Sequence, residues 1–223
     1  MSQAKSDPLS LRRPATQRRA EVLLQSVRQA ARQILEKDGP NGLTTNHVAE
    51  RAGVSVGSVY HYYPNKDAII ADLFEELVNQ LAEEIALKGQ EDIYGGQSLP
   101  EAFETFVSLM FKHRSRLAGL HREFLERWGY RFEITSRQAP DGRTFAQVTH
   151  DSLVELLSEH RERIAVTDAD AAAHGVSLLA EGFGRACWEE RLPGLPIDEI
   201  TRSVVNAMLA FVGYSGGPAQ APS

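Results

Sequence analysis

The sequence contains few of the residues that build disulfide-stabilised or membrane-spanning proteins. It has one cysteine, Cys187, in 223 residues, so no disulfide can form within the chain. No apolar run approaches the roughly 18 residues that a membrane helix requires. The N-terminal residues include several Arg, Ser and Gln, which does not fit a secretory signal. These features predict a cytoplasmic protein that has no membrane partner.

The common motifs of enzymes and metal sites are also missing from the sequence. It contains no phosphate-binding loop, no Gly-x-Ser-x-Gly sequence and no cysteine cluster. His113 and His121 are eight residues apart, which fits neither an i, i+4 metal pair nor a zinc signature. We therefore expect a protein that is not an enzyme, with no catalytic residues, no metal site and no cofactor.

The net charge of −6 is divided unevenly along the chain. Residues 1–66 hold ten Lys and Arg against five Asp and Glu, a net charge of +5. The whole chain holds 24 and 30, which leaves 14 and 25 for residues 67–223, a net charge of −11. A basic segment in an acidic chain indicates an anionic partner for that segment, but a chance fluctuation gives the same pattern.

Almost every segment after Thr16 has apolar residues at the helical period, separated by Gly and Pro. The sequence therefore predicts an all-α fold of about nine helices, in which the helical pattern over residues 99–128 has a break near Ser115. Four regions are expected: a flexible basic arm over residues 1–15, a first helical domain over 16–66, a second over 67–214, and a disordered tail over 215–223.

Twenty residues from Thr45 to Pro64 fit a helix-turn-helix, the motif of many DNA-binding proteins. Gly53 stands at the turn, and apolar or small residues fill the inner positions of both helices. These inner positions are Val48, Ala49, Ala52, Val54, Val59 and Tyr62. The outward face of the second helix then carries Ser55, Val56, Gly57, Ser58, Tyr60 and His61. Such a small, uncharged face can approach a major groove and bond phosphates or base edges.

The segment GLTTNHVAERAGVSVGSVYHYYPNKDAIIADLF, residues 42–74, resembles the DNA-binding signature of the TetR family of bacterial transcriptional regulators. Two departures are mild: Tyr63 stands where the family more often has Phe, and Ile69 and Ile70 stand where it often has Leu-Leu. The resemblance implies three N-terminal helices for DNA binding and about six more for ligand binding and dimerisation. It makes residues 16–66 the DNA-binding domain and 67–214 the ligand-binding and dimerisation domain.

The resemblance also implies which residues contact DNA. These are Thr45, Ser55, Val56, Gly57, Ser58, Tyr60, His61 and Tyr62, with Lys66 holding a phosphate. At Gly57 the helix backbone is expected to lie close to the duplex, and for His61 a solvated surface position is the alternative. Tyr63 is expected in the core and Thr44 as an N-cap. The arginines near the N-terminus either enter a minor groove or belong to a solvated tail; they are Arg12, Arg13, Arg18 and Arg19.

For the C-terminal part, the resemblance implies a ligand cavity among the helices. The candidate lining residues are Phe106, Met110, His113, His121, Phe124, Trp128, Phe145 and Phe183. An ordinary core would use the same apolar groups, so this alternative stays open. The last two helices, expected over residues 168–192 and 197–212, are implied to form a homodimer.

The sequence therefore predicts a homodimeric repressor that binds a pseudo-palindromic operator in double-stranded DNA and is released by a small-molecule effector. An activator or a global DNA binder of the same fold is one alternative. A helical small-molecule enzyme or carrier whose DNA-binding segment is idle is the other.

Overall fold

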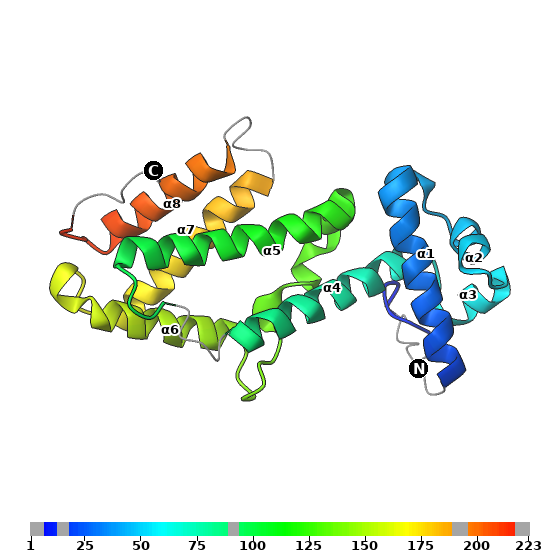
Figure 1. Cartoon of the computed structure of the whole chain (residues 1–223), viewed down its shortest axis with the longest axis horizontal. Coiled ribbons are helices and arrows are strands. Elements are labelled where there is room, and N and C mark those ends of the chain that lie inside the picture. The colour runs from blue at the N-terminus through cyan, green and yellow to red at the C-terminus, as the bar shows by residue number, and fades with distance from the viewer. Residues whose placement is uncertain (1–6, 13–17, 89–93, 189–195, 217–223) are drawn as a thin grey trace, which may run out of the picture. The chain divides into compact units, whose positions relative to one another are not determined.

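The computed structural model describes residues 7–12, 18–88, 94–188 and 196–216. Within these ranges the regular structure is helical, with eight α-helices, three 3₁₀ segments and no strand, which confirms the predicted fold class. In chain order the elements are α1 (Arg18–Gly42), α2 (Thr45–Ala52), α3 (Val56–Tyr62), α4 (Lys66–Lys88), α5 (Leu99–Trp128), η1 (Gly129–Arg131), η2 (Ile134–Ser136), α6 (Phe145–Glu159), η3 (Arg161–Arg163), α7 (Ala169–Trp188) and α8 (Ile197–Phe211) (Figure 1).

The chain divides into two compact units. The head unit comprises Met1–Gln80 and Arg116–Phe132, and the body unit comprises Leu81–Ser115 and Glu133–Ser223. The head unit therefore extends beyond residue 66, where the sequence analysis places the end of the first domain. It also includes residues 116–128 of α5.

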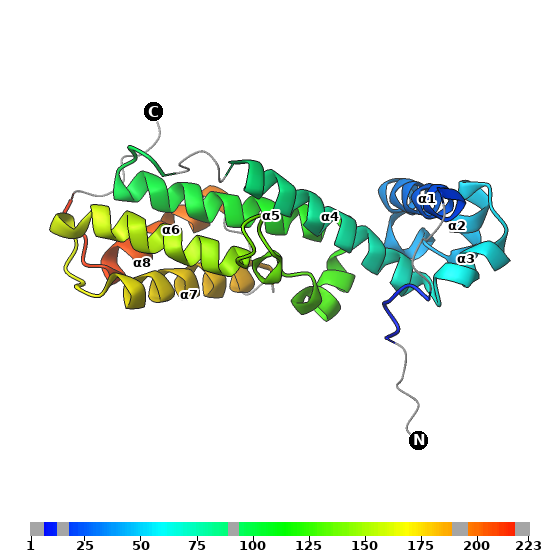
Figure 2. The ribbon, with the colours of Figure 1, turned by 90° about the horizontal axis from the view of Figure 1, so that it is seen from below.

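Helix α1 buries one apolar face in the head unit. Its apolar residues recur at the helical period, and the buried ones are Ala20, Leu24, Val27, Ala30, Ala31 and Ile34. Gly39 interrupts the helix with a φ of 69°, a left-handed conformation that glycine adopts easily, and Pro40 follows it. Helices α2 and α3 lie side by side next to α1 (Figures 1 and 2). The interruption at Gly39 agrees with the stop that the Gly39-Pro40 pair predicts.

Helix α5 is interrupted at His121, where φ is −165° and ψ is 97°. The Nδ1 atom of His121 accepts a hydrogen bond of 3.2 Å from the backbone N–H of Phe124, so the side chain acts as an N-cap for the second part of the helix. The predicted break near Ser115 is therefore wrong by six residues. Because the two parts count as one helix, the described residues contain eight α-helices where about nine were expected.

Residues 7–12 lie against the rest of the head unit. Asp7 forms an ion pair with Arg131, and this hydrogen-bonded guanidinium is the largest cause that holds the pKa of Asp7 well below its usual range. Leu9 is only 6% exposed, and the side-chain amide of Asn65 donates to the carbonyl of Pro8 at 3.1 Å. These residues are thus not the free arm that the sequence predicts; residues 1–6 and 13–15 lie outside the described ranges.

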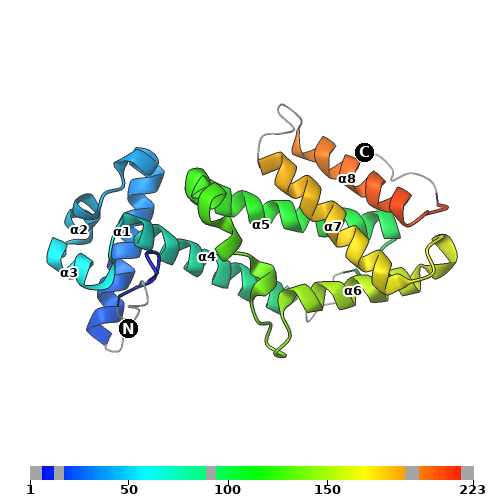
Figure 3. The same cartoon turned by 180° about the vertical axis from the view of Figure 1, so that it is seen from behind.

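The body unit is a bundle in which the first part of α5 packs with α6, α7 and α8 (Figures 2 and 3). Its core is apolar; the largest fully buried side chains there are Phe103, Leu99, Leu153 and Leu157. Gly175 of α7 lies against Phe211 of α8, and a Cβ atom at Gly175 would stand 2.2 Å from the ring. Helices α7 and α8 can therefore cross this closely only because residue 175 is a glycine, which has no side chain.

None of the helices in the described part of the chain is long and apolar enough to span a membrane.

Candidate nucleic-acid interface

Helix α2 is capped at both ends, by Thr44 at its N-terminus and by Gly53 at its C-terminus. The hydroxyl of Thr44 accepts a hydrogen bond of 3.1 Å from the backbone N–H of His47 and caps the N-terminus. Gly53 follows the helix with a φ of 68°, in the left-handed region, and the N–H of Val54 then donates to the carbonyl of Ala49 at 3.0 Å. The turn therefore forms where the motif predicts it, and Thr44 is the N-cap that the sequence indicates.

Helix α3 has only seven residues, and its position is fixed at both ends. Ser55 caps the N-terminus, because its Oγ accepts a hydrogen bond of 3.0 Å from the N–H of Ser58. Val59 is fully buried and anchors the inner face, together with Val48 and Ala49 of α2. The rest of α3 is left to face outward.

The predicted contact residues differ in exposure. Ser55, Val56, Gly57, Tyr60, His61 and Lys66 are exposed, whereas Ser58 and Tyr62 are half-buried. The hydroxyl of Ser58 lies 2.7 Å from that of Ser55, and the ring of Tyr62 packs edge-on against His61. Thr45 is only 8% exposed, which leaves it less available to DNA than the sequence pattern indicates. The exposed face of α3 nevertheless remains continuous.

Gly57 has no packing partner that would require glycine. A Cβ atom at this position would meet only the Oγ of Ser55, at 3.8 Å, which is ordinary van der Waals contact. A glycine inside a helix costs roughly 1 kcal/mol relative to alanine. The packing of the head unit therefore gives no reason for this cost, and the close approach of DNA at Gly57 stays a prediction.

A hollow of about 300 Å³ lies beside the exposed face of α3. Its lining residues come from the start of α2, from α3 and from the start of α4; they are Thr44, Thr45, Asn46, Tyr60, Pro64, Asn65 and Lys66. Asn65 caps α4 by accepting a hydrogen bond of 2.9 Å from the N–H of Ala68. Lys66 thus stands in the first turn of a helix, where the backbone N–H groups also attract anions.

Asn46 is an exposed polar residue of this hollow that the sequence analysis missed. It follows Thr45 in the first turn of α2, so its position next to a predicted contact was the available signal. Its side-chain amide can donate to a phosphate or pair with a base edge.

A network of polar side chains holds the end of α3 against α1 and α4. The hydroxyl of Tyr63 donates to Asp72 at 2.5 Å, and the Nε of Arg28 donates to the same carboxylate at 2.8 Å. Burial, followed by the charge of Asp72, raises the pKa of Tyr63 well above its usual range, so this hydroxyl stays protonated as a donor. Tyr63 is fully buried, as predicted, and its hydroxyl additionally fixes the end of α3 to the core of the head unit.

Arg12 contacts the C-terminal end of α3. Its backbone N–H donates to the carbonyl of Tyr62 at 2.7 Å, and its guanidinium donates to the carbonyl of Tyr60 at 3.1 Å. A cation is favourable at this end of a helix dipole. Arg18 and Arg19 are exposed at the start of α1, whereas Arg13 lies outside the described residues.

The predicted ligand-pocket residues fall into the two units. Phe106, Met110, His113, Phe145 and Phe183 belong to the body unit, and His121, Phe124 and Trp128 to the head unit. Phe124 packs against Phe74 and Phe132 with ring centroids 5.2 and 5.9 Å away. A hollow of about 340 Å³ in the head unit, lined by α1, α4 and residues 116–120 of α5, includes none of the eight.

The comparisons with known proteins agree with this geometry. The sequence profile of bacterial regulatory proteins of the tetR family matches residues 27–73, which cover the second half of α1 through the first third of α4. Residues 27–73 therefore carry the DNA-binding domain of the TetR family. This match supports a transcriptional regulator of that family, and the all-α fold with an N-terminal helix-turn-helix is the fold expected of such a protein.

Two relatives and one solved structure illustrate the similarity. The fatty acid metabolism regulator protein of Bacillus subtilis is 33% identical over 92 residues, which span 41% of this chain and 44% of the relative. The HTH-type transcriptional regulator BetI of Escherichia coli K12 is 24% identical over 79% of this chain and 88% of its own length. A putative TetR-family regulator from Mesorhizobium loti has the same fold, with a TM-score of 0.53, 17% identity, and coverage of 88% of this chain and all of the other.

Proposed function

We propose that this TetR-family regulator is a homodimeric repressor that binds a pseudo-palindromic operator through α3 and is released by a small-molecule effector. The observation that carries the proposal is the exposed face of α3: it is uncharged, it contains a glycine without an internal role, and it is fixed to the core through Tyr63. Lys66 and Asn46, at the hollow beside it, supply polar groups for the DNA backbone.

The homodimer would form through α7 and α8. Leu178 on α7 is 68% exposed and Phe211 on α8 is 46% exposed, both unusually high for large apolar side chains on adjoining helices of one unit. A two-fold interface through these helices would pair two copies of α3 with two half-sites, which accounts for a pseudo-palindromic operator.

The effector would bind in the body unit. Phe106 belongs to its apolar core, and Met110 and Phe183 are partly buried and pack against that core, so a hydrophobic molecule inserted there would find matching side chains. The dimer would have one arrangement that binds the operator and one that does not. The effector would release the protein from the operator only if it binds the second arrangement more tightly than the first.

Electrophoretic mobility shift with the DNA that flanks the protein's own gene tests the regulator. We expect a specific complex that survives excess competitor DNA. Tyr60→Ala and Lys66→Ala should weaken it, by about 1–3 kcal/mol for a base contact and less for a single phosphate contact. Arg161→Ala, at an exposed residue of η3 outside α7 and α8, is the matched control and should bind normally.

The outcomes separate the alternatives. A specific shift combined with lower transcription when the protein is absent would favour the activator. Binding to all DNA sequences alike would favour the global binder. No specific shift, together with turnover of a metabolite, would overturn the regulator in favour of an enzyme or carrier.

A further inference from the structure

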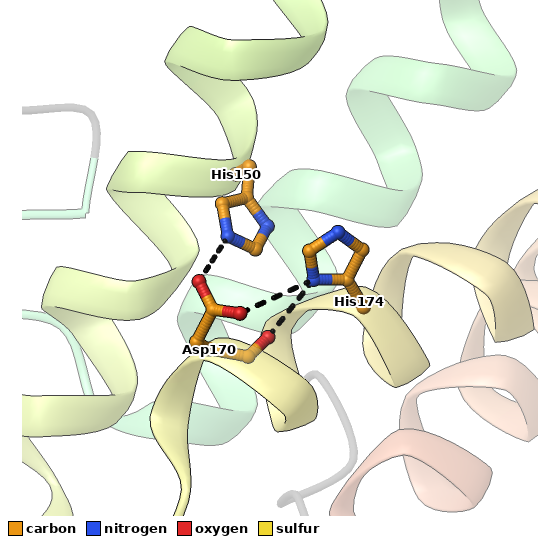
Figure 4. Close-up of side chains that lie close together, drawn as sticks. All are labelled: His150, Asp170 and His174. Atoms are coloured by element: carbon orange, nitrogen blue, oxygen red, sulfur yellow. Dashed lines mark hydrogen bonds and ion pairs between the residues drawn. The ribbon is translucent and has the colours of Figure 1, made fainter.

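Three side chains that can bind metal ions converge on the surface of the body unit. His150 comes from α6, and Asp170 and His174 come from the first turns of α7 (Figure 4). The Nε2 of His150 lies 2.9 Å from the Oδ1 of Asp170, and the two imidazole centroids are 4.2 Å apart. One ligand atom from each residue lies within 4.8 Å of the others.

The local sequence fixes this arrangement. The carboxylate of Asp168 accepts a hydrogen bond of 3.0 Å from the N–H of Ala171, which caps α7 and determines where the helix begins. Asp170 and His174 are then four residues apart and lie on the same face of the helix. The packing of α6 against α7 brings His150 to that face, so the group joins two helices of one unit.

The distances are close to those that a cation requires. Two ligand atoms about 2.0–2.1 Å from a tetrahedral ion stand roughly 3.3 Å apart. The Oδ1 of Asp170 is 2.9 Å from the Nε2 of His150, and its Oδ2 is 3.8 Å from the Nδ1 of His174, so the two distances lie on either side of that value. Small side-chain rotations would therefore place all three ligand atoms around one ion.

The exposure of the three residues suits an open site. The His150 side chain is 22% exposed and thus partly held by packing, whereas those of Asp170 and His174 are 71% and 66% exposed. Solvent can reach the remaining coordination positions, which water would fill. Two imidazoles with one carboxylate suit zinc and its neighbours, whereas Mg²⁺ and Ca²⁺ prefer sets of oxygen ligands.

We propose that His150, Asp170 and His174 form a binding site for a divalent first-row transition cation of the Zn²⁺ type. His150 coordinates through Nε2, Asp170 through a carboxylate oxygen and His174 through Nδ1. The Nδ1 of His174 lies 3.1 Å from the backbone carbonyl of Asp170, so the ion replaces that hydrogen bond and the ring keeps its proton on Nε2. The bound ion clamps the start of α7 to α6.

The test uses the full-length protein without a histidine tag, freed of metal with a chelator. Co²⁺ is titrated while the visible absorption of the bound ion is followed, and Zn²⁺ is then added as a competitor. We expect one saturable site per chain that Zn²⁺ displaces and that Mg²⁺ does not. Zn²⁺ should also raise the unfolding temperature, because it binds the folded state selectively.

Three variants remove one ligand each: His150→Gln, Asp170→Asn and His174→Gln. Each should lower the Co²⁺ affinity at least about tenfold, since even changes to the groups behind metal ligands cost ten- to a hundredfold. His61→Gln is the matched control, because it removes an exposed histidine in the head unit. Circular dichroism without metal shows whether each variant folds, and a folded variant with lost binding supports the site.

Two results would overturn the proposal. One is the absence of saturable Co²⁺ or Zn²⁺ binding to the wild-type protein, which would make the group a hydrogen-bonded surface cluster only. The other is binding that survives all three substitutions, which would assign the ion to other residues. Both readouts are independent of DNA, so a failure of the proposed repressor function leaves this test intact.

Discussion

Helix α3 of the head unit and helix α7 of the body unit both contain glycine, but for different physical reasons. Gly175 of α7 is needed within the unit, because the ring of Phe211 occupies the space of a side chain. Gly57 of α3 has open space around it. Gly175 therefore serves the packing of its own unit, whereas Gly57 has no such role, which supports the proposal that DNA approaches the backbone of α3 closely.

The same difference appears in how the two units are held together. The head unit positions α3 through caps and a polar network around Asp72, next to an apolar core that includes Phe74 and Ile69. The body unit depends on a large apolar cluster from α5 to α8. Substitutions that act on only one of these features therefore test the contrast.

The largest expected effect is that of Asp72→Ala on the head unit. Asp72 is 12% exposed and Arg28 is 28% exposed, so the substitution leaves a largely buried guanidinium and the Tyr63 hydroxyl without their acceptor. We expect the free energy of unfolding to fall by about 3 kcal/mol and operator binding to weaken, because α3 loses its anchor. Urea denaturation and fluorescence anisotropy with labelled DNA measure the two effects.

Asn79→Ala provides the control for Asp72→Ala, since Asn79 is an exposed residue of the same helix within the head unit. It should change neither measurement by more than about 0.5 kcal/mol. If Asp72→Ala behaved like this control, the polar network would have no role in positioning α3.

The next effect concerns the body unit and its proposed dimer. Leu178→Arg places a charge on the exposed apolar face of α7 and should weaken dimerisation by at least about 2 kcal/mol, or roughly thirtyfold. Analytical ultracentrifugation over a range of concentrations measures this change. Val22→Arg, at a 57% exposed apolar residue of α1, is the matched control. A dimer that tolerates Leu178→Arg would place its interface elsewhere.

Gly57→Ala tests the comparison most directly. The substitution should stabilise α3 by up to about 1 kcal/mol, because alanine favours the helix and meets no close atom. It should nevertheless weaken operator binding about tenfold or more, since the added methyl group would separate the backbone from the duplex. Stability and affinity are thus expected to change in opposite directions.

Gly119→Ala is the control for this pair of measurements. Gly119 is also a helical glycine with no atom within 4 Å of an added Cβ, and it lies in α5 within the head unit. It should raise stability and leave DNA binding unchanged. Equal DNA affinities for Gly57→Ala and the wild type would refute close backbone approach at α3.

The sequence predicted the parts of the fold that depend on neighbouring residues. The cap at Thr44, the turn at Gly53 and the burial of Val59 follow from fixed spacing within one short segment. The fold class followed from helical periodicity. The contacts of α3 with DNA remain predictions, because exposure shows that a face is available but not what binds it.

Contacts between distant residues could not be predicted. Arg12 reaches the carbonyl of Tyr60 across 48 positions, and nothing in either local sequence specifies the other. His150 approaches Asp170 across 20 positions and an intervening loop, so residue spacing gave no metal signature. The break in α5 was misplaced because its cap is a histidine, which is not a usual N-cap residue.

The smallest expected effect comes from this cap. Burial is the main cause that lowers the pKa of His121 below its usual value of 6.5; the negative charge of Glu123 opposes it, the positive charge of Lys66 adds to it, and Asp67 and a backbone hydrogen bond oppose it more weakly. Above pH 6.5 the residue is neutral in both states, and its contribution to stability is complete. As the pH falls below 6.5 the unfolded chain takes up the proton first, so the free energy of unfolding falls.

The loss attributable to His121 at pH 5.5 is at most about 1.4 kcal/mol, the limit for one group that titrates at 6.5 only when unfolded. His121→Asn keeps a side chain that caps helices but does not titrate. Urea denaturation at pH 7.5 and 5.5 should therefore show a smaller acid loss in the variant than in the wild type. Identical losses would mean that His121 takes up its proton equally well in the folded head unit, and that its cap does not require the neutral ring.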